Sequence, residues 1–448
     1  VATRGQVGRV LQCVVATALG LAALAAHLRW RRDGRTRFVL ASALLLAGAL
    51  AAGEMGLGAV AFLASAALVF EKGVVRKLVA LAPPMVVSTI WLGVYSLGRF
   101  GAHGSGLYID PGSEPLRFLG ALAQRGPILA LGAWTPLFSD AANVLSREQA
   151  WGLAGLGALV VATLAALFGP ILRRDANARF FALGALLAGV PAAATNPSNR
   201  LLVLVGFGVA GLLALLAVER FSAGTDAPRR RSVAWALAWA VPILGFFHLF
   251  VAPLMTPWYA ASIAQLGEPA ARSARALPVE IAGRDTYALN PPDYLLNVSF
   301  ALPIRAAEGL ANPRRFRGLA AGPIGFEGVR INERTLELFA DPEVEHGFLS
   351  GPLGHLFRGE DRAVRVGESI ALPGFEATVL EVSASGAPRR VSFRFDRPLD
   401  DPSLAFVAWR GERPTLWRPT AIGQPFALEP SRGGFETLAA GGSNHDQL

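Results

Sequence analysis

The apolar stretch from Phe38 to Phe70 constrains the fold of this chain more than any other feature. Its sequence, FVLASALLLAGALAAGEMGLGAVAFLASAALVF, holds one charged residue, Glu54, near the middle. A single helix of this length would run roughly 50 Å at about 1.5 Å per residue. The hydrocarbon core of a bilayer is only about 30 Å thick. The stretch therefore predicts two short membrane helices joined by a tight turn at 53–56, where glycines supply the backbone freedom.

Composition supports a membrane protein. Of 448 residues, 52% are hydrophobic and only 17% are charged, and the mean hydropathy is +0.41. Such values are unusual for a soluble domain, and they predict the lipid bilayer as the main partner. The net charge of +9 comes from arginines in short loops between apolar runs, which is the positive-inside pattern. It does not indicate nucleic-acid binding. The single cysteine, Cys13, provides no disulfide framework and no metal site.

The apolar runs predict an α-helical polytopic membrane domain of about eight spans over residues 1–253. Besides the two helices of 38–70, the expected spans are 9–28, 78–97, 150–171, 180–195, 201–218 and 232–252. This count puts the four arginine- or lysine-rich connections on the cytoplasmic side and the amino terminus outside. An amino terminus on the outer side is unusual, and it suggests that a first helix and a first external loop precede the given sequence. Arginine and alanine abound while lysine occurs only at 72 and 77, which suggests a bacterial chain and the inner (cytoplasmic) membrane.

The pattern changes after the membrane domain. Residues 254–285 are expected to form an interfacial linker, with a helix along the membrane surface. Residues 286–448 predict an all-β, sandwich-like extracytoplasmic domain. Alternation is clearest at 390–396, where Val391, Phe393 and Phe395 share one face. Further strands are expected at 334–339, 375–382 and 404–409, with an antiparallel arrangement.

Two segments are candidates for chemistry. Glu54 lies at the membrane border, where a carboxylate is costly unless paired or hydrated; the alternative is an exposed turn residue. The loop 99–115 holds His103, Tyr108, Asp110 and Glu114 among glycines and prolines. Asp110 and Glu114 are the candidate catalytic acid and base, and with His103 and Tyr108 they could bind substrate or a divalent cation. The alternative is an ordinary loop in which Asp-Pro and Glu-Pro mark turns.

The third candidate is Arg200, in the short external turn 195–200. An arginine at the external end of a helix can bind a phosphate. The alternative, a side chain that snorkels to the membrane surface, is the more common reason for an arginine at this position. The six histidines show no metal-binding spacing, so no metal site is assigned.

The segment Ala51-Ala52-Gly53-Glu54-Met55-Gly56-Leu57-Gly58-Ala59 runs into an apolar helix ending near Phe70-Glu71-Lys72 and follows the arginine-rich loop RWRRDGRTR. This arrangement, together with the turn Asn196-Pro197-Ser198-Asn199-Arg200, resembles polytopic glycosyltransferases of the GT-C superfamily, especially the protein O-mannosyltransferase-like branch. The resemblance covers about residues 9–253. Glycine stands at 53 where the family often has lysine. The family's catalytic aspartate belongs to a first external loop that this sequence does not contain, so the resemblance assigns its role to no residue here.

The resemblance implies a glycosyltransferase, or part of one, that takes a sugar from a polyprenyl-phosphate donor on the outer face. Glu54 and the 99–115 loop would line the cavity, and Arg200 would meet the lipid phosphate. The competing hypothesis is a non-catalytic membrane scaffold or envelope protein that displays the β domain for binding. A transporter is disfavoured, because the spans show few charges and no matched broken helices.

Overall fold

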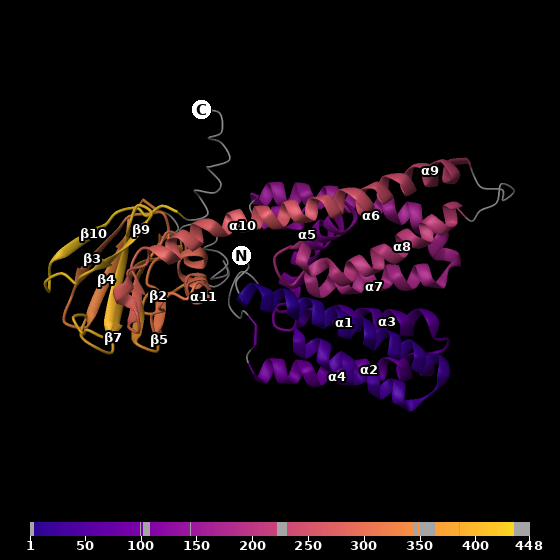
Figure 1. Ribbon diagram of the computed structural model, residues 1–448, viewed down its shortest axis with the longest axis horizontal. Coiled ribbons are helices and arrows are strands. Elements are labelled where there is room, and N and C mark those ends of the chain that lie inside the picture. Colours follow the sequence, from indigo (N-terminus) through magenta and orange to yellow (C-terminus); the bar gives the residue numbers. More distant parts are fainter. Residues whose placement is uncertain are drawn as a thin grey trace. The chain divides into compact units, whose positions relative to one another are not determined.

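The structure, a computed structural model, describes residues 4–98, 100–101, 108–143, 145–221, 231–341, 343–344, 347–349, 363–384 and 386–433 (Figure 1). The chain divides into two compact units. The helical unit is built from Gln6–His103 and Tyr108–Trp258, and the β unit mainly from Tyr259 onward. Each unit is described by itself below.

The helical unit consists of helices joined by short connections. In chain order they are α1 (Arg4–Asp33), α2 (Thr36–Ala52), η1 (Glu54–Gly56), α3 (Leu57–Phe70), α4 (Val74–Leu97), α5 (Pro115–Trp134), η2 (Ser139–Asn143), α6 (Arg147–Arg174), α7 (Ala176–Ala192), η3 (Asn199–Leu202), α8 (Val203–Phe221), α9 (Arg231–Phe246) and η4 (Phe247–Val251). The chain then enters α10 (Ala252–Ala276), within which the β unit begins.

Several of these helices can cross a membrane. Within the described residues, five helical stretches have the necessary length and apolar character: Gln12–Asp33, Val74–Leu97, Glu148–Arg174, Asn199–Phe221 and Trp239–Ala261. Three further apolar helices, α2, α3 and α7, are shorter, at 17, 14 and 17 residues. At about 1.5 Å per residue they measure roughly 21–26 Å, less than the bilayer core. A helical membrane region is therefore present, with five long and three short apolar helices where the sequence predicted eight spans.

The chain bends at Glu54, as the sequence predicted. Helix α2 ends at Ala52, Gly53 is extended, and the single turn η1 leads into α3. Gly56 lies so close to the backbone of Ala49 that a Cβ atom would come within 2.8 Å of its carbonyl group. This glycine allows the turn to fold back against the end of α2.

Small residues bring α3, α7 and α8 together. A Cβ atom on Gly184 would come within 2.3 Å of the Phe62 ring, and one on Gly208 within 2.7 Å of Ala185 and of the Phe181 carbonyl oxygen. Phe62 is 1% exposed and lies at the centre of the helical core. Close backbone approach at glycines is the usual way in which membrane helices pack.

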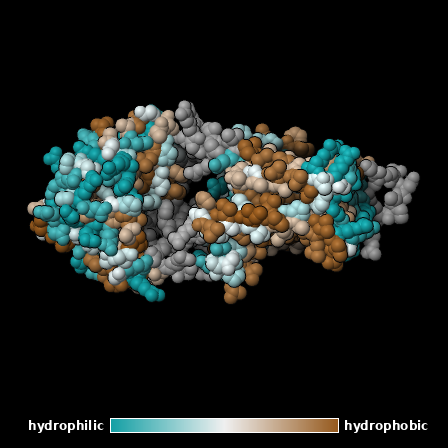
Figure 2. Space-filling model, turned by 90° about the horizontal axis from the view of Figure 1, so that it is seen from below, coloured by the Kyte–Doolittle hydropathy of each residue, from teal (hydrophilic) through white to brown (hydrophobic). Residues whose placement is uncertain are grey.

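The outer surface of the helical unit is strongly apolar. Leu97 is 88% exposed, Leu44 74% and Leu249 72%. Figure 2 shows hydrophobic side chains over much of the helical unit, while hydrophilic ones predominate on the β unit. Such a surface requires an apolar solvent. Together with the five long apolar helices, it makes the chain a multi-pass membrane protein.

The segment 98–149, expected to be one long connection, contains helix α5. This helix packs along α6, with a Cβ atom on Gly157 of α6 falling 2.2 Å from the Pro127 carbonyl oxygen of α5. Three leucine and isoleucine side chains of α5, at 128, 129 and 131, are 2% exposed. The sequence pattern missed the helix because Arg117, Gln124 and Arg125 interrupt its apolar residues.

The β unit contains two sheets. The four-stranded sheet has the order β2-β1-β8-β9, and the six-stranded sheet has the order β10-β3-β4-β7-β6-β5. The strands are β1 (Asp285–Ala288), β2 (Arg315–Gly318), β3 (Phe326–Arg330), β4 (Thr335–Ala340), β5 (Ser369–Leu372), β6 (Phe375–Val382), β7 (Pro388–Phe395), β8 (Leu404–Arg410), β9 (Arg413–Trp417) and β10 (Pro425–Leu428). The four predicted strands correspond to β4, β6, β7 and β8.

One hydrophobic core joins the two sheets. Tyr287 and Phe406 from the smaller sheet pack with Phe375 and Phe395 from the larger one, with ring centroids 4.9–5.7 Å apart. The other face of the small sheet is covered by the end of α10 and by α11 (Ala301–Ala307), through a second core around Trp409.

The β unit differs from the predicted antiparallel, all-β domain in two ways. Strand β1 pairs in parallel with both β2 and β8. The chain between β1 and β2 forms helix, including the π-helix η6 (Leu295–Ser299), where the sequence had looked strand-like. A parallel pair needs such a crossover, so helix α11 and the parallel pairing belong together.

Candidate functional site

Glu54 lies at one end of the helical unit, here called the connection end. This end holds the turn at 53–56, the segments before and after α5, and the turn 195–200. The hydroxyl of Tyr95, near the end of α4, donates a hydrogen bond to Glu54 Oε1. Gly101 lies over this hydroxyl, and its backbone has φ +101°. A Cβ atom there would come within 2.7 Å of the tyrosine oxygen, so glycine is needed both for the conformation and for the space. The turn at Glu54 and the end of α4 therefore form one site.

Tyr108 and Asp110 belong to the same site. Tyr108 forms a β-bridge with Thr195, and the Ile109 amide donates to the Ala194 carbonyl at 2.8 Å. Half-burial raises the pKa of the Tyr108 hydroxyl, and the negative charges of Asp110 and Glu54 raise it further. Asp110 follows Tyr108 by two residues in the same segment, and the influence of the Glu54 charge on Tyr108 indicates that the turn at 53–56 lies on the same side of the helical unit. Of the predicted residues, the structure thus brings together Glu54, Tyr108 and Asp110.

Asp110 is fixed by its own turn. Its Oδ1 accepts the amide of Gly112 at 2.9 Å, and its Oδ2 accepts the hydroxyl of Ser113 at 3.1 Å. Each oxygen retains a lone pair, because a carboxylate can accept about four hydrogen bonds. Glu114 lies just before α5 and pairs with Arg117 at 2.7 Å. Its charge is therefore partly neutralised, which makes Asp110 the better candidate base of the two.

The turn 195–200 is tied to the connection end by polar contacts. Asp140 in η2 accepts the Ser198 hydroxyl at 2.7 Å and the Asn199 amide at 2.8 Å. The side chain of Asn199 in turn accepts the Ser139 amide at 2.9 Å. Arg125 of α5 donates to the Ala193 carbonyl and to Asn196 Oδ1, both at 3.2 Å.

Arg200, the predicted phosphate ligand, is exposed at the start of η3, directly after this turn. It therefore lies at the connection end, where its guanidinium is accessible. His103, the other predicted binding residue, lies outside the described residues.

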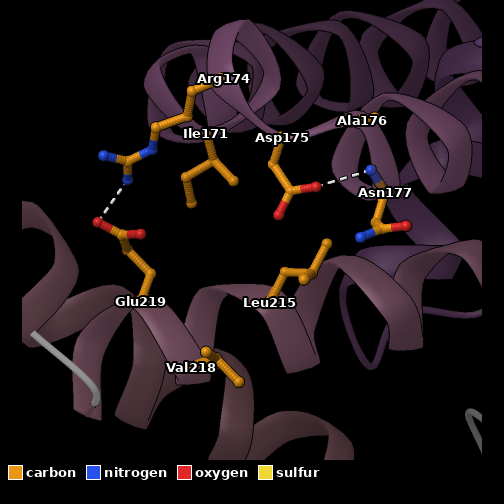
Figure 3. A pocket seen from close by; sticks show the side chains of 8 residues that line it. All are labelled: Ile171, Arg174, Asp175, Ala176, Asn177, Leu215, Val218 and Glu219. Carbon is orange, nitrogen blue, oxygen red and sulfur yellow. Dashed lines mark hydrogen bonds and ion pairs between the residues drawn. The ribbon is translucent and has the colours of Figure 1, made fainter.

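The opposite end of the helical unit carries the arginine-rich connections. Arg31 in the last turn of α1 pairs with Glu71 at 2.6 Å, and Arg174 at the end of α6 pairs with Glu219 of α8. A cavity of about 470 Å³ lies there. Figure 3 shows side chains that line it, among them Arg174, Glu219 and the α7 cap Asp175. Asp175 Oδ1 accepts the amide of Asn177 at 2.7 Å and so caps α7. Arg174 and Glu219 neutralise each other, and Asp175 accepts a hydrogen bond from the first turn of α7. We therefore assign these groups a structural role.

Three polar residues of the connection end were not predicted from the sequence: Tyr95, Arg125 and Asp140. A signal existed for two of them. Tyr95 follows Trp91 by one helical turn at the end of a span, where aromatic residues gather, and Arg125 interrupts an apolar run. The sequence left open whether a divalent cation binds at this site. In the described part of the chain, no group of three or more His, Cys, Asp or Glu side chains is arranged to hold a metal ion.

The fold and the site define a multi-pass helical membrane protein with a carboxylate–tyrosine site and a carboxy-terminal β-sheet unit. Comparisons with protein-family models, with curated proteins and with solved structures found no match.

Proposed function

We propose that this protein is a membrane glycosyltransferase that takes a sugar from a polyprenyl-phosphate donor at the connection end. The observation that carries the proposal is the convergence of Glu54 and Asp110 with Tyr95 and Tyr108, from three separate segments. Two carboxylates and two phenols at the end of membrane helices suit acid–base work on a hydroxyl-bearing substrate. The donor's lipid chain would lie along the apolar helices, beside the site.

In the proposed reaction, Asp110 accepts the proton of an acceptor hydroxyl. The acceptor oxygen attacks the anomeric carbon, and the bond from this carbon to the phosphate oxygen breaks with inversion. The leaving polyprenyl phosphate keeps the bonding electrons, and Arg200 is suited to meet its charge. The protonated Asp110 side chain then gives up its proton to water. Glu54, held by Tyr95, would orient the sugar.

The proposal includes a sidedness. The connections rich in arginine would face the cytoplasm, as positively charged loops usually do. The connection end and the β unit would then be extracytoplasmic, in a bacterial inner membrane. The β unit, with its two sheets sharing one core like a sandwich, would be available to bind the acceptor.

The test measures transfer of radiolabelled hexose from undecaprenyl-phosphate-linked mannose or glucose in membranes of cells that express the chain. Asp110→Asn keeps an oxygen for the Gly112 amide, so the turn is preserved while the base is lost. We expect the transfer rate to fall about 10²–10⁴-fold. Asp175→Asn, a change of the same type at the opposite end, is the control and should leave the rate unchanged. Transfer no greater than in cells without the chain would instead favour the scaffold hypothesis.

A further inference from the structure

Three aromatic rings lead up to the carboxylates of the connection end. Trp91 and Tyr95 lie one turn apart on α4, with ring centroids 4.9 Å apart, and Phe100 follows at 5.9 Å from Tyr95. The Phe100 ring lies over Gly98, where a Cβ atom would come within 2.3 Å of it. Phe100 is nevertheless 55% exposed, so one of the rings offers an open face beside the Tyr95–Glu54 hydrogen bond.

From this arrangement we infer that Phe100, Tyr95, Glu54 and Asp110 form a subsite for a neutral sugar ring. The electron-rich face of an aromatic ring attracts the polarised C–H groups on one face of a pyranose. Carboxylates accept hydrogen bonds only, and sugar hydroxyls donate them. An exposed aromatic face next to two carboxylates therefore matches a ring with a C–H face and hydroxyls at its edge.

The charge of the subsite sets its selectivity. Glu54, which accepts the Tyr95 hydroxyl, and Asp110, two residues after Tyr108, give the subsite two carboxylates. A sugar with its own carboxylate would meet like charges, which disfavours binding. The subsite therefore accepts neutral hexoses and rejects uronic acids.

An aromatic belt at the membrane border would also explain exposed Trp, Tyr and Phe side chains. It would not explain why the Tyr95 hydroxyl is directed to a carboxylate, nor why glycines at 98 and 101 leave room for the rings. The belt and the subsite predict different behaviour toward sugars, so an experiment separates them. The inference deepens the proposed function and rests on it for the identity of the reaction.

The experiment is saturation-transfer NMR on the detergent-solubilised whole chain. The probes are the methyl glycosides of glucose, mannose and galactose, with glucuronate and galacturonate as charged counterparts. We expect at least one neutral glycoside to bind, and its uronate to bind at least about tenfold more weakly. Phe100→Leu, which keeps an apolar side chain but removes the aromatic face, should weaken binding about three- to tenfold. Phe100→Tyr should restore it.

The matched control is Phe246→Leu, because Phe246 is also 55% exposed but lies on α9, which packs on α8 and α6. It should leave sugar binding unchanged. Equal binding of uronates and neutral glycosides, binding insensitive to Phe100→Leu, or no saturation transfer to any glycoside would each overturn the subsite. Sugar binding without hexose transfer would keep the subsite and overturn the enzymatic proposal. Hexose transfer at the same rate in Phe100→Leu as in the unchanged protein would keep the enzymatic proposal and overturn the subsite.

Discussion

Asp140 shows how single side chains assemble the connection end. Its two carboxylate oxygens accept one hydrogen bond each from Ser198 and Asn199, which are separated from it by 58 and 59 residues. Asp140 belongs to η2, and its two partners belong to the turn before α8. A charged acceptor that receives a backbone amide makes a stronger bond than a neutral one. This residue therefore holds the turn that carries Arg200 against the rest of the site.

Removing this carboxylate should loosen the turn. In Asp140→Ala we expect hydrogen exchange at the Asn199 amide to become about 10- to 100-fold faster, because a hydrogen bond to a charged group contributes about 1.5–3 kcal/mol. Exchange measured by mass spectrometry over 195–200 checks this. Asp140→Asn keeps one acceptor oxygen and should give an intermediate rate. The Asn143 side chain also donates to the Pro197 carbonyl of this turn, at 3.0 Å. Unchanged protection in the alanine variant would show that Arg125 and Asn143 hold the turn without Asp140.

At the scale of elements, the packing of α3, α7 and α8 depends on particular glycines. Gly208 of α8 touches α7 at Ala185 and Phe181, whereas Gly206, two residues earlier on the same helix, has open space where a Cβ would be. Glycine itself lowers helix stability by about 1 kcal/mol relative to alanine. Its presence at 208 is explained by close packing, and its presence at 206 is not.

This pair of glycines gives a matched test. Gly208→Ala should destabilise the protein by about 1–3 kcal/mol, because the added methyl group must push α7 and α8 apart. Gly206→Ala should be neutral or stabilising through helix propensity. Thermal unfolding of the purified protein in detergent compares the two variants. The same loss of stability in both would mean that the helices do not meet at Gly208.

The sequence predicted those elements whose pattern is local. The bend at Glu54 follows from the length of the apolar stretch, and β7 follows from its alternating residues. Strand β1 could not be found in this way, because all four of its residues are buried and no alternation exists. The same holds for the site. Glu54, Tyr108 and Asp110 stood out locally, but the Tyr95–Glu54 bond joins residues 41 positions apart, and no local pattern encodes it.

At the scale of the whole helical unit, the two ends differ in their chemistry. The connection end carries Glu54 and Asp110 with their tyrosines, while the opposite end carries Arg31, Arg174 and further arginines beside their acidic partners. The helices α1–α4 and α6–α9 each carry the chain from one end to the other, whereas the segments before and after α5 both contact residues 194–199 at the connection end (Figure 1). In a membrane, the arginine-bearing end is expected in the cytoplasm.

This difference predicts which positions an impermeant thiol reagent can reach. In a Cys13→Ser background, Ser113→Cys at the connection end should be labelled in intact cells. Thr36→Cys, at the first residue of α2 directly after the arginine-rich connection, should be labelled only after permeabilisation. Ser65→Cys is the control for access, since Ser65 is 0% exposed and should stay unlabelled in both conditions. Labelling of Thr36→Cys but not of Ser113→Cys in intact cells would reverse the orientation. The carboxylates would then face the cytoplasm, where the proposed outer-face donor could not reach them.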